Sequence, residues 1–491
     1  MNKPIRRVAI FCFLLIACLL ASSNYLQVIN ASSYKARAGN DRNKYDAYAY
    51  PRGRILTADG TVIADSVPSG GLSYKYQRQY PLKADYANVT GYKTMDYGAS
   101  DIESVLDKYL AGTDGSESVA NFMDTLTGKS KKGGDVQLTL QNAVQQAAIS
   151  KLTGKTGSVV ALDPTTGAIL AMYSNPAFDP NGIASNDGDT ASAAGKALDA
   201  QKDKPNLNHA IGENYPPGSV FKIVTAAAAL DTGQFTETGR TDAPRGPLTW
   251  SGSGTTLPNE DGDCPGTDLK TALAQSCNSV YGWIGDKLGP QVMAQYAAKF
   301  GFNTPGLKVP MPVAQSNFPT FSQIGSDSVT LAQASVGQND TQVTPLQAAM
   351  IAGAVADGGA IMQPYLVDKE TAPNGHVTYQ GKDHRHQLSQ AMSPATANTL
   401  DDMMKNVVVN GTAQQDAVNG VQMGAKTGTA QRGQNQNPLA WFVCYGTANG
   451  KHVTVAVMVQ TDNPAVRDTI SGAQYAGPVA TAVLKAALGV S

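Results

Sequence analysis

The chain has 491 residues, which at about 150 residues a domain suggests roughly three domains. Apolar residues make up 42% and charged residues only 16%, so there is material for a large buried core. Lys and Arg number 38 and Asp and Glu 39, for a formal net charge of -1. Such a balance gives no overall basic field and excludes nucleic acid as the expected main partner.

The N-terminus carries an apolar run, VAIFCFLLIACLLAS over 8–22, behind three basic residues within the first seven. Weaker apolar character continues to Val28, long enough for a spanning helix of about 20 residues. The pattern predicts a single-pass protein of the cell membrane, with a cytoplasmic N-terminus over 1–7, an anchor over 8–28 and an extracytoplasmic remainder. Two cleaved alternatives stay open: a signal peptide ending near Ala21, and a lipoprotein box at 15–18.

Residues 40–134 are polar and Tyr-rich with frequent turn signals, and 29–134 are predicted to form a separate domain. Within it, RGRILTADGTVIADS over 52–66 alternates like two strands around an Asp-Gly hairpin turn. The stretch GKSKKGG over 128–134 has the composition of a linker. We therefore expect a small, mostly β domain before residue 135.

From residue 135 onward, strand patterns stand near both ends and helical patterns fill the middle. This order predicts one α/β unit (of α+β type) with an antiparallel sheet and a helical subdomain. The predicted strands are 135–141, two arms within 157–174, 439–446 and 452–460. The predicted helices follow 141 through about Leu152, dominate Ser219 to about 300, and recur over 345–357 and 472–488. The small polar residues of 186–205 indicate a mobile loop.

A first chemical pattern lies in PPGSVFKIVTAAAAL, 216–230, where a Pro-Gly break precedes an apolar helix. Ser219 and Lys222 are three residues apart and share a face of the first helical turn. The exposed N–H groups and dipole of a helix N-terminus favour the negative charge that develops on a reacting serine. A neutral, buried lysine can take the serine proton, so no histidine is needed. Alone, the pattern also fits a helix-capping serine beside a solvated lysine.

Two further elements add weight to Ser219. Ser276 and Asn278 flank Cys277 between two helical patterns, where a hydroxyl and an amide can reach one cavity. Lys426, Thr427, Gly428 and Thr429 stand in a strand-like stretch, where a lysine and two hydroxyls can grip a carboxylate. Gly428 would let a substrate backbone approach the strand edge closely. Each element is weak alone, and 155–157 is a decoy for the second one.

Ser-x-x-Lys, then Ser-x-Asn, then Lys-Thr-Gly follow one another along the chain. This order of three motifs resembles that of the penicillin-recognising serine transpeptidases and serine β-lactamases. The surroundings of Ser219 and the segments 160–181 and 343–359 are similar to the same family. RGRILTADGTVIA, 52–64, resembles the start of the extracellular part of class B penicillin-binding proteins, and the short length is most like their actinobacterial PbpA branch. The resemblance covers nearly the whole chain. It implies a transpeptidase fold over 135–491 and a non-catalytic pedestal or dimerisation-type domain over 29–134.

The resemblance also implies roles for the motif residues. Ser219 would attack the D-Ala-D-Ala bond with Lys222 as its base, Ser276 would pass a proton to the leaving D-Ala, and Asn278 would hold the donor peptide. The backbone N–H groups of Ser219 and Thr429 would form the oxyanion hole. The terminal carboxylate of the peptide, or that of penicillin, would be held by Lys426, Thr427, Gly428 and Thr429. No metal or organic cofactor is implied.

The implied function is cross-linking of peptidoglycan stem peptides through a serine acyl-enzyme, with β-lactam antibiotics as acylating inhibitors. Implied partners are D-Ala-D-Ala donors, amine acceptors, a polytopic glycan polymerase and proteins of the division or elongation machinery. A β-lactamase is disfavoured because no Glu-containing deacylation motif is evident and 29–134 would be superfluous. A drug sensor or a D,D-carboxypeptidase uses the same motifs and remains open. A non-catalytic scaffold would need none of them, and the N-terminal region is too short for a second enzyme.

Cys277, in the middle of the second motif, is a departure from the family pattern. Its thiolate is an alternative nucleophile, but Ser219 already has its lysine. Pairing with Cys264 upstream is favoured in an oxidising compartment. Cys444 lies in a predicted core strand and is expected to stay a free apolar residue.

Overall fold

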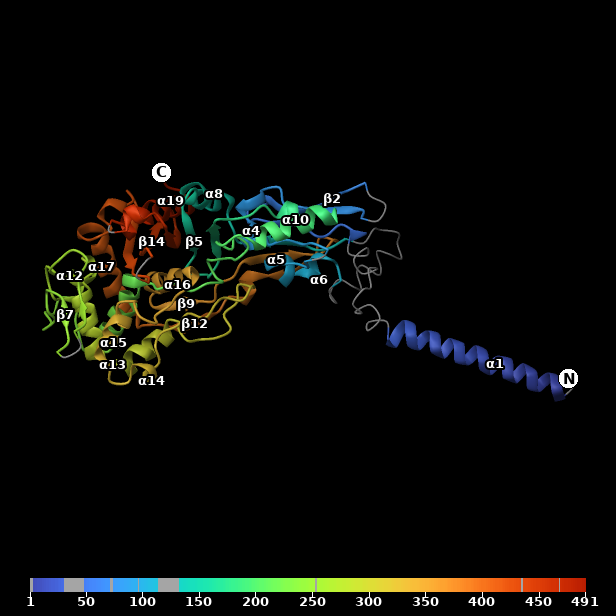
Figure 1. Cartoon of the computed structure of the whole chain (residues 1–491), viewed down its shortest axis with the longest axis horizontal. Helices are drawn as coiled ribbons and strands as arrows, with labels where there is room; N and C mark the ends of the chain where they lie inside the picture. The colour runs from blue at the N-terminus through green and yellow to red at the C-terminus, as the bar shows by residue number, and fades with distance from the viewer. Residues whose placement is uncertain are drawn as a thin grey trace.

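The computed structural model describes residues 3–30, 48–70, 74–95, 97–113, 132–251, 254–433, 436–467 and 469–491. Figure 1 shows a small N-terminal group of strands lying beside a larger mixed unit that ends at the C-terminus. The predicted linker 128–134 lies outside the described residues as far as 131.

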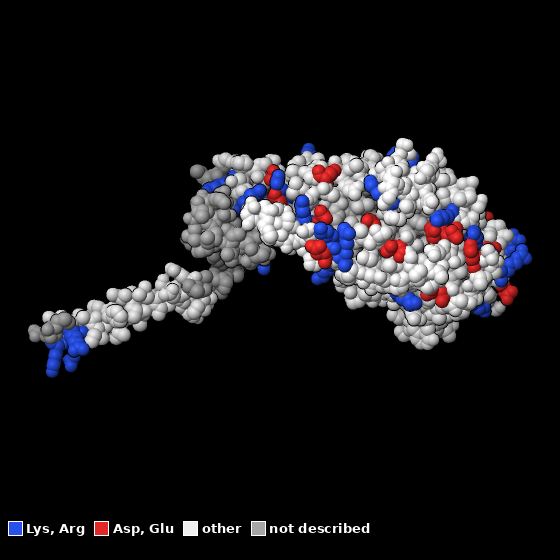
Figure 2. All heavy atoms as spheres, turned by 180° about the vertical axis from the view of Figure 1, so that it is seen from behind, with Lys and Arg blue, Asp and Glu red and all other residues white. Residues whose placement is uncertain are grey.

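The N-terminal apolar run forms helix α1 (Lys3–Asn24), which continues as a π-helical turn over Tyr25–Ile29. Its side chains are exposed along its length, and the mean hydropathy reaches 2.2 within Lys3–Gln27. Within the described ranges, it is the single helix long and apolar enough to cross a membrane. Figure 2 shows its basic residues gathered at the N-terminal tip and uncharged residues along its shaft.

The predicted Asp-Gly hairpin is confirmed. Strand β1 (Ile55–Leu56) pairs antiparallel with β2 (Val62–Pro68) across a turn in which Gly60 has φ 84°. A positive φ is available to glycine at little cost, which explains the residue at this turn. β2 pairs in turn with β3 (Tyr76–Gln79).

The sheet that contains this hairpin has six strands in the order β11-β10-β4-β1-β2-β3. Its other members come from farther along the chain: β4 (Asp135–Leu138), β10 (Val367–Thr371) and β11 (Val377–Gln380). Short helices accompany it: α4 (Ala87–Thr90), α5 (Asp101–Val105) and α6 (Asp107–Leu110). Backbone pairing of β1 and β4 is parallel, so the two halves of the chain are joined through the middle of one sheet.

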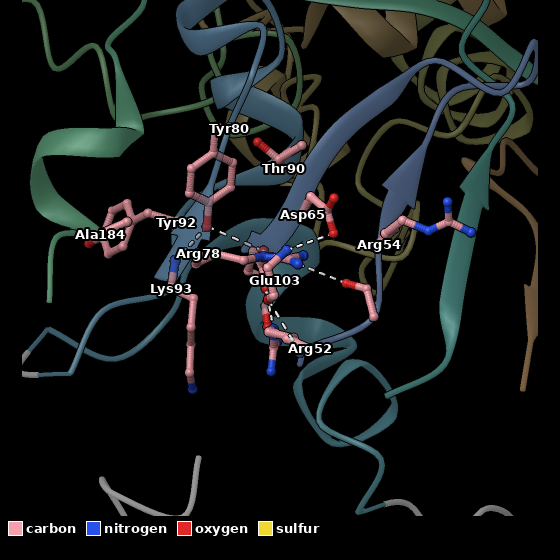
Figure 3. A network of polar contacts seen from close by, with 12 residues as sticks. Arg52, Arg54, Asp65, Arg78, Tyr80, Thr90, Tyr92, Lys93, Glu103 and Ala184 are labelled. Carbon is pink, nitrogen blue, oxygen red and sulfur yellow. Dashed lines mark hydrogen bonds and ion pairs between the residues drawn. The ribbon is translucent and has the colours of Figure 1, made fainter. Parts of the chain in front are cut away.

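A buried ion network ties α5 to this sheet (Figure 3). Glu103 is fully buried and accepts hydrogen bonds of 2.6 Å from Arg52 Nε and from Arg78 Nε. Tyr80 donates its hydroxyl to the same carboxylate at 3.2 Å. Burial raises the pKa of Glu103, but the charges of Arg78 and Arg52 outweigh it and hold the pKa below its usual value.

The larger unit is built on a five-stranded antiparallel sheet in the order β13-β14-β15-β5-β6. The strands are β5 (Thr156–Leu162), β6 (Ile169–Asn175), β13 (Gln422–Ala430), β14 (Leu439–Ala448) and β15 (Lys451–Gln460). Strands near the two ends of the unit therefore share one sheet, as the sequence predicts. Successive residues of β14 and β15 are buried, so both faces of the sheet are covered.

Helices α8 (Asn142–Leu152) and α19 (Gly477–Leu488) pack together on the sheet, and α16 (Pro345–Ala356) also packs on β14, β15 and β5. Figure 1 shows α8 and α19 above these strands and α16 below them. The predicted C-terminal helix is split into α18 (Gly472–Tyr475) and α19, with Pro478 in the first turn of the second helix. α17 (Pro394–Asn410) packs against β13, and β9 (Ala360–Met362) pairs with β12 (Gln387–Gln390).

The helical subdomain contains α11 (Lys222–Asp231), α12 (Leu269–Ala274), α13 (Asn278–Lys299), α14 (Phe321–Ile324) and α15 (Ser328–Ser335). The prediction of helix from Ser219 to about 300 is wrong in its centre. Between α11 and α12 the described chain forms a loop with one small hairpin, β7 (Leu248–Thr249) and β8 (Thr256–Leu257). Several prolines and glycines in this segment oppose helix formation.

The predicted mobile loop over 186–205 is also wrong over most of its length. Residues Gly188–Asp199 form helix α10, following the short α9 (Pro180–Ile183). The Asp187 side chain caps α10 by accepting from Thr190 N at 2.8 Å, and Leu198 is buried. Small residues lowered the apolar signal, but a cap and one buried face suffice to hold the helix.

Candidate active site

Ser219 lies in a tight 3-10 turn, Gly218–Phe221, that leads directly into α11. Gly218 has φ 52° and donates its N–H to Gly337 O at 2.9 Å, which fixes the turn against the loop after α15. Trp441 Nε1 donates to Pro216 O at 3.0 Å and holds the entry to the turn. The predicted helix start at Ser219 is therefore confirmed, although its first turn is 3-10 in form.

Lys222 is fully buried at the base of the cleft. Its Nζ donates to Ser276 O at 2.5 Å and to Asn278 Oδ1 at 2.7 Å, with Ser276 Oγ at 3.4 Å. Burial lowers the pKa of Lys222 well below its usual value, and the charge of Lys426 lowers it further. Glu260 opposes this shift without cancelling it. A neutral amine of this kind can accept a proton from a hydroxyl one helical turn away.

Lys426, from the middle of β13, also contacts the Ser276 hydroxyl. Its Nζ donates to Ser276 Oγ and to its neighbour Thr427 O, each at 2.8 Å. Burial lowers the pKa of Lys426 to about 7. Ser276 itself has φ 58°, a left-handed conformation that turns the chain between α12 and α13. The hydroxyl of Ser276 thus lies between two buried amines, a suitable place for a proton relay.

Asn278 is the first residue of α13 rather than part of a loop. Its Oδ1 accepts from Lys222, and its Nδ2 donates to Pro258 O at 2.8 Å. The neighbouring Ser279 N donates to Asn259 Oδ1 at 2.9 Å. The loop of residues 257–261, which lines the cleft, is therefore bound to the start of α13.

The predicted disulfide is confirmed, because Cys264 and Cys277 are bonded. It joins the loop that carries Glu260 to the middle residue of the Ser276–Asn278 motif. Cys277 is consequently not a free thiolate and does not compete with Ser219. Cys444 is free and buried in β14, as the sequence predicts, and burial raises the pKa of its thiol.

Thr427, Gly428 and Thr429 follow Lys426 on β13 and have different neighbours. Thr427 Oγ1 lies 2.6 Å from Thr412 Oγ1, and Thr429 lines the cleft beside Ser219. A Cβ on Gly428 would lie 3.1 Å from the Cβ of Trp441 and 3.2 Å from Pro217 O. Close packing of β13 on the turn before Ser219 is therefore one structural reason for this glycine.

Ser219, Asn278 and Thr429 face one open cleft of about 730 Å³. Lys222, Ser276 and Lys426 lie beneath it as a buried chain of hydrogen bonds. The three motifs are thus brought together from the start of α11, the α12–α13 junction and strand β13. This arrangement can attack a carbonyl with a serine, move protons between two amines and a hydroxyl, and bind a carboxylate.

Sequence reasoning did not single out Glu260, Asn259, Gly337 and Trp441, although all four shape this site. Glu260 and Asn259 line the cleft from a loop whose sequence, LPNEDGD, reads as an ordinary turn. Gly337 and Trp441 hold the Ser219 turn from segments more than 100 residues away. The bonded pair Cys264 and Cys277 was the one local signal that could have pointed to the 257–261 loop.

Two family models match the chain. One, for the penicillin-binding protein transpeptidase domain, matches residues 157–489, and the other, for the penicillin-binding protein A dimerisation domain, matches 52–136. The chain belongs to the penicillin-binding protein transpeptidase family. The family model covers all three motifs and nearly all of the five-stranded sheet, so the resemblance drawn from the motifs is confirmed.

Two relatives of this transpeptidase-family chain are similar to it over almost their whole length, and a third over a shorter part. It is 37% identical to the peptidoglycan D,D-transpeptidase PbpA of Mycolicibacterium smegmatis, over 99% of each chain. It is 36% identical to the protein of the same name from Mycobacterium tuberculosis, again over 99% of each. The penicillin-binding protein PbpB of M. smegmatis is 28% identical over 85% of this chain and 66% of its own length.

Solved structures give the same result for the transpeptidase fold. The ceftriaxone acyl-enzyme of M. tuberculosis penicillin-binding protein A superposes with a TM-score of 0.84 and 35% identity. The penicillin G acyl-enzyme of that protein superposes with a TM-score of 0.82 and 34% identity. These structures cover 90% and 89% of this chain and all of their own chains.

Proposed function

We propose that this chain is a peptidoglycan D,D-transpeptidase that forms an acyl-enzyme on Ser219 and is acylated by β-lactams. The observation that carries the proposal is the buried chain from Lys222 through Ser276 to Lys426 beneath the Ser219 cleft. The names of its relatives, and their acyl-enzyme structures with penicillin G and other β-lactams, support the same chemistry.

In the first step, neutral Lys222 takes the proton of Ser219 Oγ, which attacks the carbonyl of the penultimate D-Ala. The negative charge on the carbonyl oxygen would be held by the N–H groups of Ser219 and Thr429, each worth about 3–4 kcal/mol in serine hydrolases. The C–N bond then breaks, and the proton from Lys222 reaches the leaving amine through Ser276 Oγ. Lys222 is again neutral when the acyl-enzyme has formed.

The second step reverses the first with a different amine. An amine of a neighbouring stem peptide attacks the acyl ester, loses its proton to the same relay, and releases Ser219. Asn278 would orient the donor backbone, while Lys426, Thr427 and Thr429 would hold the terminal carboxylate. Gly428 would contribute by allowing β13 to pack closely behind Ser219. None of these steps calls for a metal ion or an organic cofactor.

We also propose that residues 1–7 are cytoplasmic, 8–28 anchor the chain in the plasma membrane, 29–134 form a pedestal and 135–491 the catalytic domain. The apolar helix α1, with basic residues at its tip, and the two family matches support this division. The pedestal would contact a glycan polymerase and other proteins of division or elongation.

The decisive experiment is intact mass spectrometry of the full chain in detergent with benzylpenicillin, followed over hours. We expect a persistent adduct that is absent from Ser219→Ala and retained in Ser322→Ala, which changes an exposed serine outside the cleft. A transient adduct with rapid drug turnover would instead indicate a β-lactamase. If folded protein forms no adduct, the chain would instead be a non-catalytic scaffold.

A second assay separates the transpeptidase from a sensor or a carboxypeptidase. The chain is supplied with a stem peptide ending in D-Ala-D-Ala and with a second stem peptide that carries a free amine. Release of D-Ala together with a cross-linked product supports the proposal. Release of D-Ala with water as sole acceptor points to a carboxypeptidase, and acylation by drug alone points to a sensor.

A further inference from the structure

Glu260 lies on the wall of the catalytic cleft, and the steps described above leave it without a role. Its side chain is open to the cleft, on a loop that is held on both sides. On one side, Pro258 O and Asn259 Oδ1 accept hydrogen bonds of 2.8 and 2.9 Å from the start of α13. On the other side, the Cys264–Cys277 disulfide fixes the loop to the second motif. A fixed backbone therefore presents this carboxylate to the cleft.

The surroundings of Glu260 place its carboxylate among the proposed catalytic residues. It accepts a hydrogen bond from the side chain of Thr429, so a loop of the helical subdomain is joined to the sheet within the cleft. Its charge opposes the effect of burial on the pKa of Lys222 and of Lys426. Burial by the cleft walls and the charge of Asp261 raise the pKa of Glu260 itself, although the two lysines and Thr429 act against them. A carboxylate with a raised pKa is a stronger base than an ordinary one.

The charge of Glu260 opposes binding of the donor peptide. Under the proposed function, the terminal carboxylate of the donor lies at Lys426, Thr427 and Thr429. Glu260 repels that carboxylate and also competes with it for the Thr429 hydroxyl. The second substrate has the opposite charge, because an aliphatic amine is a cation at neutral pH. A carboxylate in this place therefore suits the acceptor and not the donor.

The second step also has one proton more than the proposed relay can use. An acceptor amine with the pKa of a lysine side chain, about 10.4, arrives as an ammonium group with three protons. Two of these protons leave the nitrogen when it becomes the N–H of an amide. One returns to Ser219 Oγ through Lys222 and Ser276, as the ester bond to Ser219 breaks. The other must leave before the nitrogen can attack, and the relay assigns no acceptor to it.

The space that the acceptor enters is next to Glu260. The second step retraces the first with a different amine, so the acceptor nitrogen takes the place of the leaving D-Ala nitrogen. That place lies beside Ser276, and the vacated space continues to Thr429, where the D-Ala carboxylate was held. Glu260 lines the same cleft and bonds to Thr429, so its carboxylate borders this space.

We propose that Glu260 binds the protonated amine of the acceptor stem peptide and removes the proton that must leave before attack. The inference rests on the proposed function, because it assigns a residue to the second step. An ammonium N–H donates to the Glu260 carboxylate and its proton passes to it, which leaves a neutral amine with a free electron pair. The amine forms the new C–N bond and the C–O bond to Ser219 breaks. Glu260 gives its proton to water when the cross-linked product leaves.

The test measures the two steps separately in the full chain, with a donor in which sulfur replaces the scissile N–H. One acceptor is the stem peptide with a free amine, and the other is hydroxylamine, a weak base that is uncharged at neutral pH. Glu260→Gln should lower the use of the peptide amine about 100-fold, the lower range for a placed base. The use of hydroxylamine and of water should change less than about threefold, because neither has a proton to lose before attack.

Acylation by benzylpenicillin should change in the opposite direction. In Glu260→Gln it should rise by up to about fivefold, since repulsion of the drug carboxylate is removed. Glu260→Asp, which keeps the charge, should retain part of the use of the peptide amine. Asp263→Asn is the matched control, because it neutralises an exposed carboxylate on the same loop outside the cleft lining. It should change none of these rates.

The outcomes separate this role of Glu260 from misfolding and from the proposed function. A misfolded variant would lose drug acylation and both acceptors together. Normal use of the peptide amine by Glu260→Gln overturns the inference, and so does an equal loss with the peptide amine and with hydroxylamine. If the unchanged chain is acylated but forms no amide with the peptide amine, the proposed function fails at its second step and Glu260 has no such role. Failure of benzylpenicillin to acylate the unchanged chain would overturn the proposed function at its first step.

Discussion

Two clusters of buried charge in this molecule have different compositions and different consequences. In the region that matches the dimerisation-domain family model, Glu103 is fully buried between Arg52 and Arg78, and the opposite charges keep it ionised. In the catalytic cleft, Lys222 and Lys426 are equally buried, but neither forms an ion pair within the described residues. Desolvation therefore dominates there and lowers the pKa of both amines.

The comparison shows that burial by itself does not create a reactive group. A buried charge that has a charged partner stays in its ordinary form and holds elements together, at a desolvation cost that the pairing offsets. A buried lysine whose hydrogen-bond partners are neutral, and whose neighbouring carboxylate Glu260 only partly offsets burial, loses its proton more readily and can act as a base. Removing a residue from the two clusters should therefore damage different properties, chemistry in one case and stability in the other.

The largest expected effect is on the catalytic cluster. Lys222→Met should slow acylation by benzylpenicillin about 1,000-fold or more, because proton transfer by a placed base contributes about 100- to 10,000-fold. The second-order acylation rate, followed by intact mass, measures it. The variant should remain folded, although Ser276 O and Asn278 Oδ1 lose their donor, at a cost of about 1–3 kcal/mol.

Lys270→Met is the matched control, because Lys270 is a partly exposed lysine paired with Glu237. It should acylate at the normal rate. Normal acylation of Lys222→Met as well would show that another group is the base.

The next largest expected effect is on the stability provided by the Glu103 ion network. Glu103→Gln leaves Arg52 and Arg78 buried beside a neutral group and should lower the free energy of unfolding by about 3–5 kcal/mol. Denaturant titration of the full chain in detergent measures it, and protein that remains folded should acylate normally. Glu237→Gln breaks an ion pair of the same 2.6 Å length at a partly exposed site and should cost at most about 1 kcal/mol. A loss no larger for Glu103→Gln than for this control would contradict the structural role of the network.

A smaller effect comes from the disulfide that holds the catalytic cluster in place. Replacing Cys264 and Cys277 together by serine opens a loop with a sequence separation of 13 and should cost about 3 kcal/mol of stability. Acylation should also slow, because Ser276 and Asn278 lose their link to the cleft loop. Cys12→Ser, in the exposed helix α1, is the control and should change neither property. Unchanged acylation in the double variant would show that hydrogen bonds alone position the motif.

The smallest expected effect is the change in the free energy of unfolding for each pH unit. The folded chain releases the Lys426 proton near pH 7, while the unfolded chain keeps it to about 10.5. The unfolded state therefore binds more protons between these values, and the free energy of unfolding should rise with pH, by about 1.4 kcal/mol per unit for this lysine. Lys426→Met should remove that part of the slope between about pH 7 and 9, and Glu103→Gln should not. Equal slopes in the unchanged chain and Lys426→Met would mean that Lys426 is not desolvated.

Much of the fold was predictable where the signal is local. The Asp-Gly hairpin, the strands 439–446 and 452–460, and the helix over 345–357 follow from turn residues and from runs of apolar residues of the right length. Helix α10 was missed because its small residues have the composition of a loop, although Ala191, Gly195 and Leu198 are buried and the Asp187 side chain caps it. The helical patterns expected to dominate from Ser219 to about 300 are interrupted between α11 and α12, where Pro and Gly accumulate.

The sequence by itself pointed to the residues that we propose carry the chemistry, because Ser219, Lys222, Ser276, Asn278 and Lys426 lie in short motifs whose order is characteristic. It also predicted the N-terminal apolar helix and the Cys264–Cys277 pair, which depend on composition and on few alternatives. Only the tertiary structure decided that two lysines converge on Ser276 from segments 54 and 150 residues away. It also decided that ionised Glu103 is paired with two arginines. Burial and the distance between charges fix a pKa, and both are properties of the packed chain that no local pattern of residues contains.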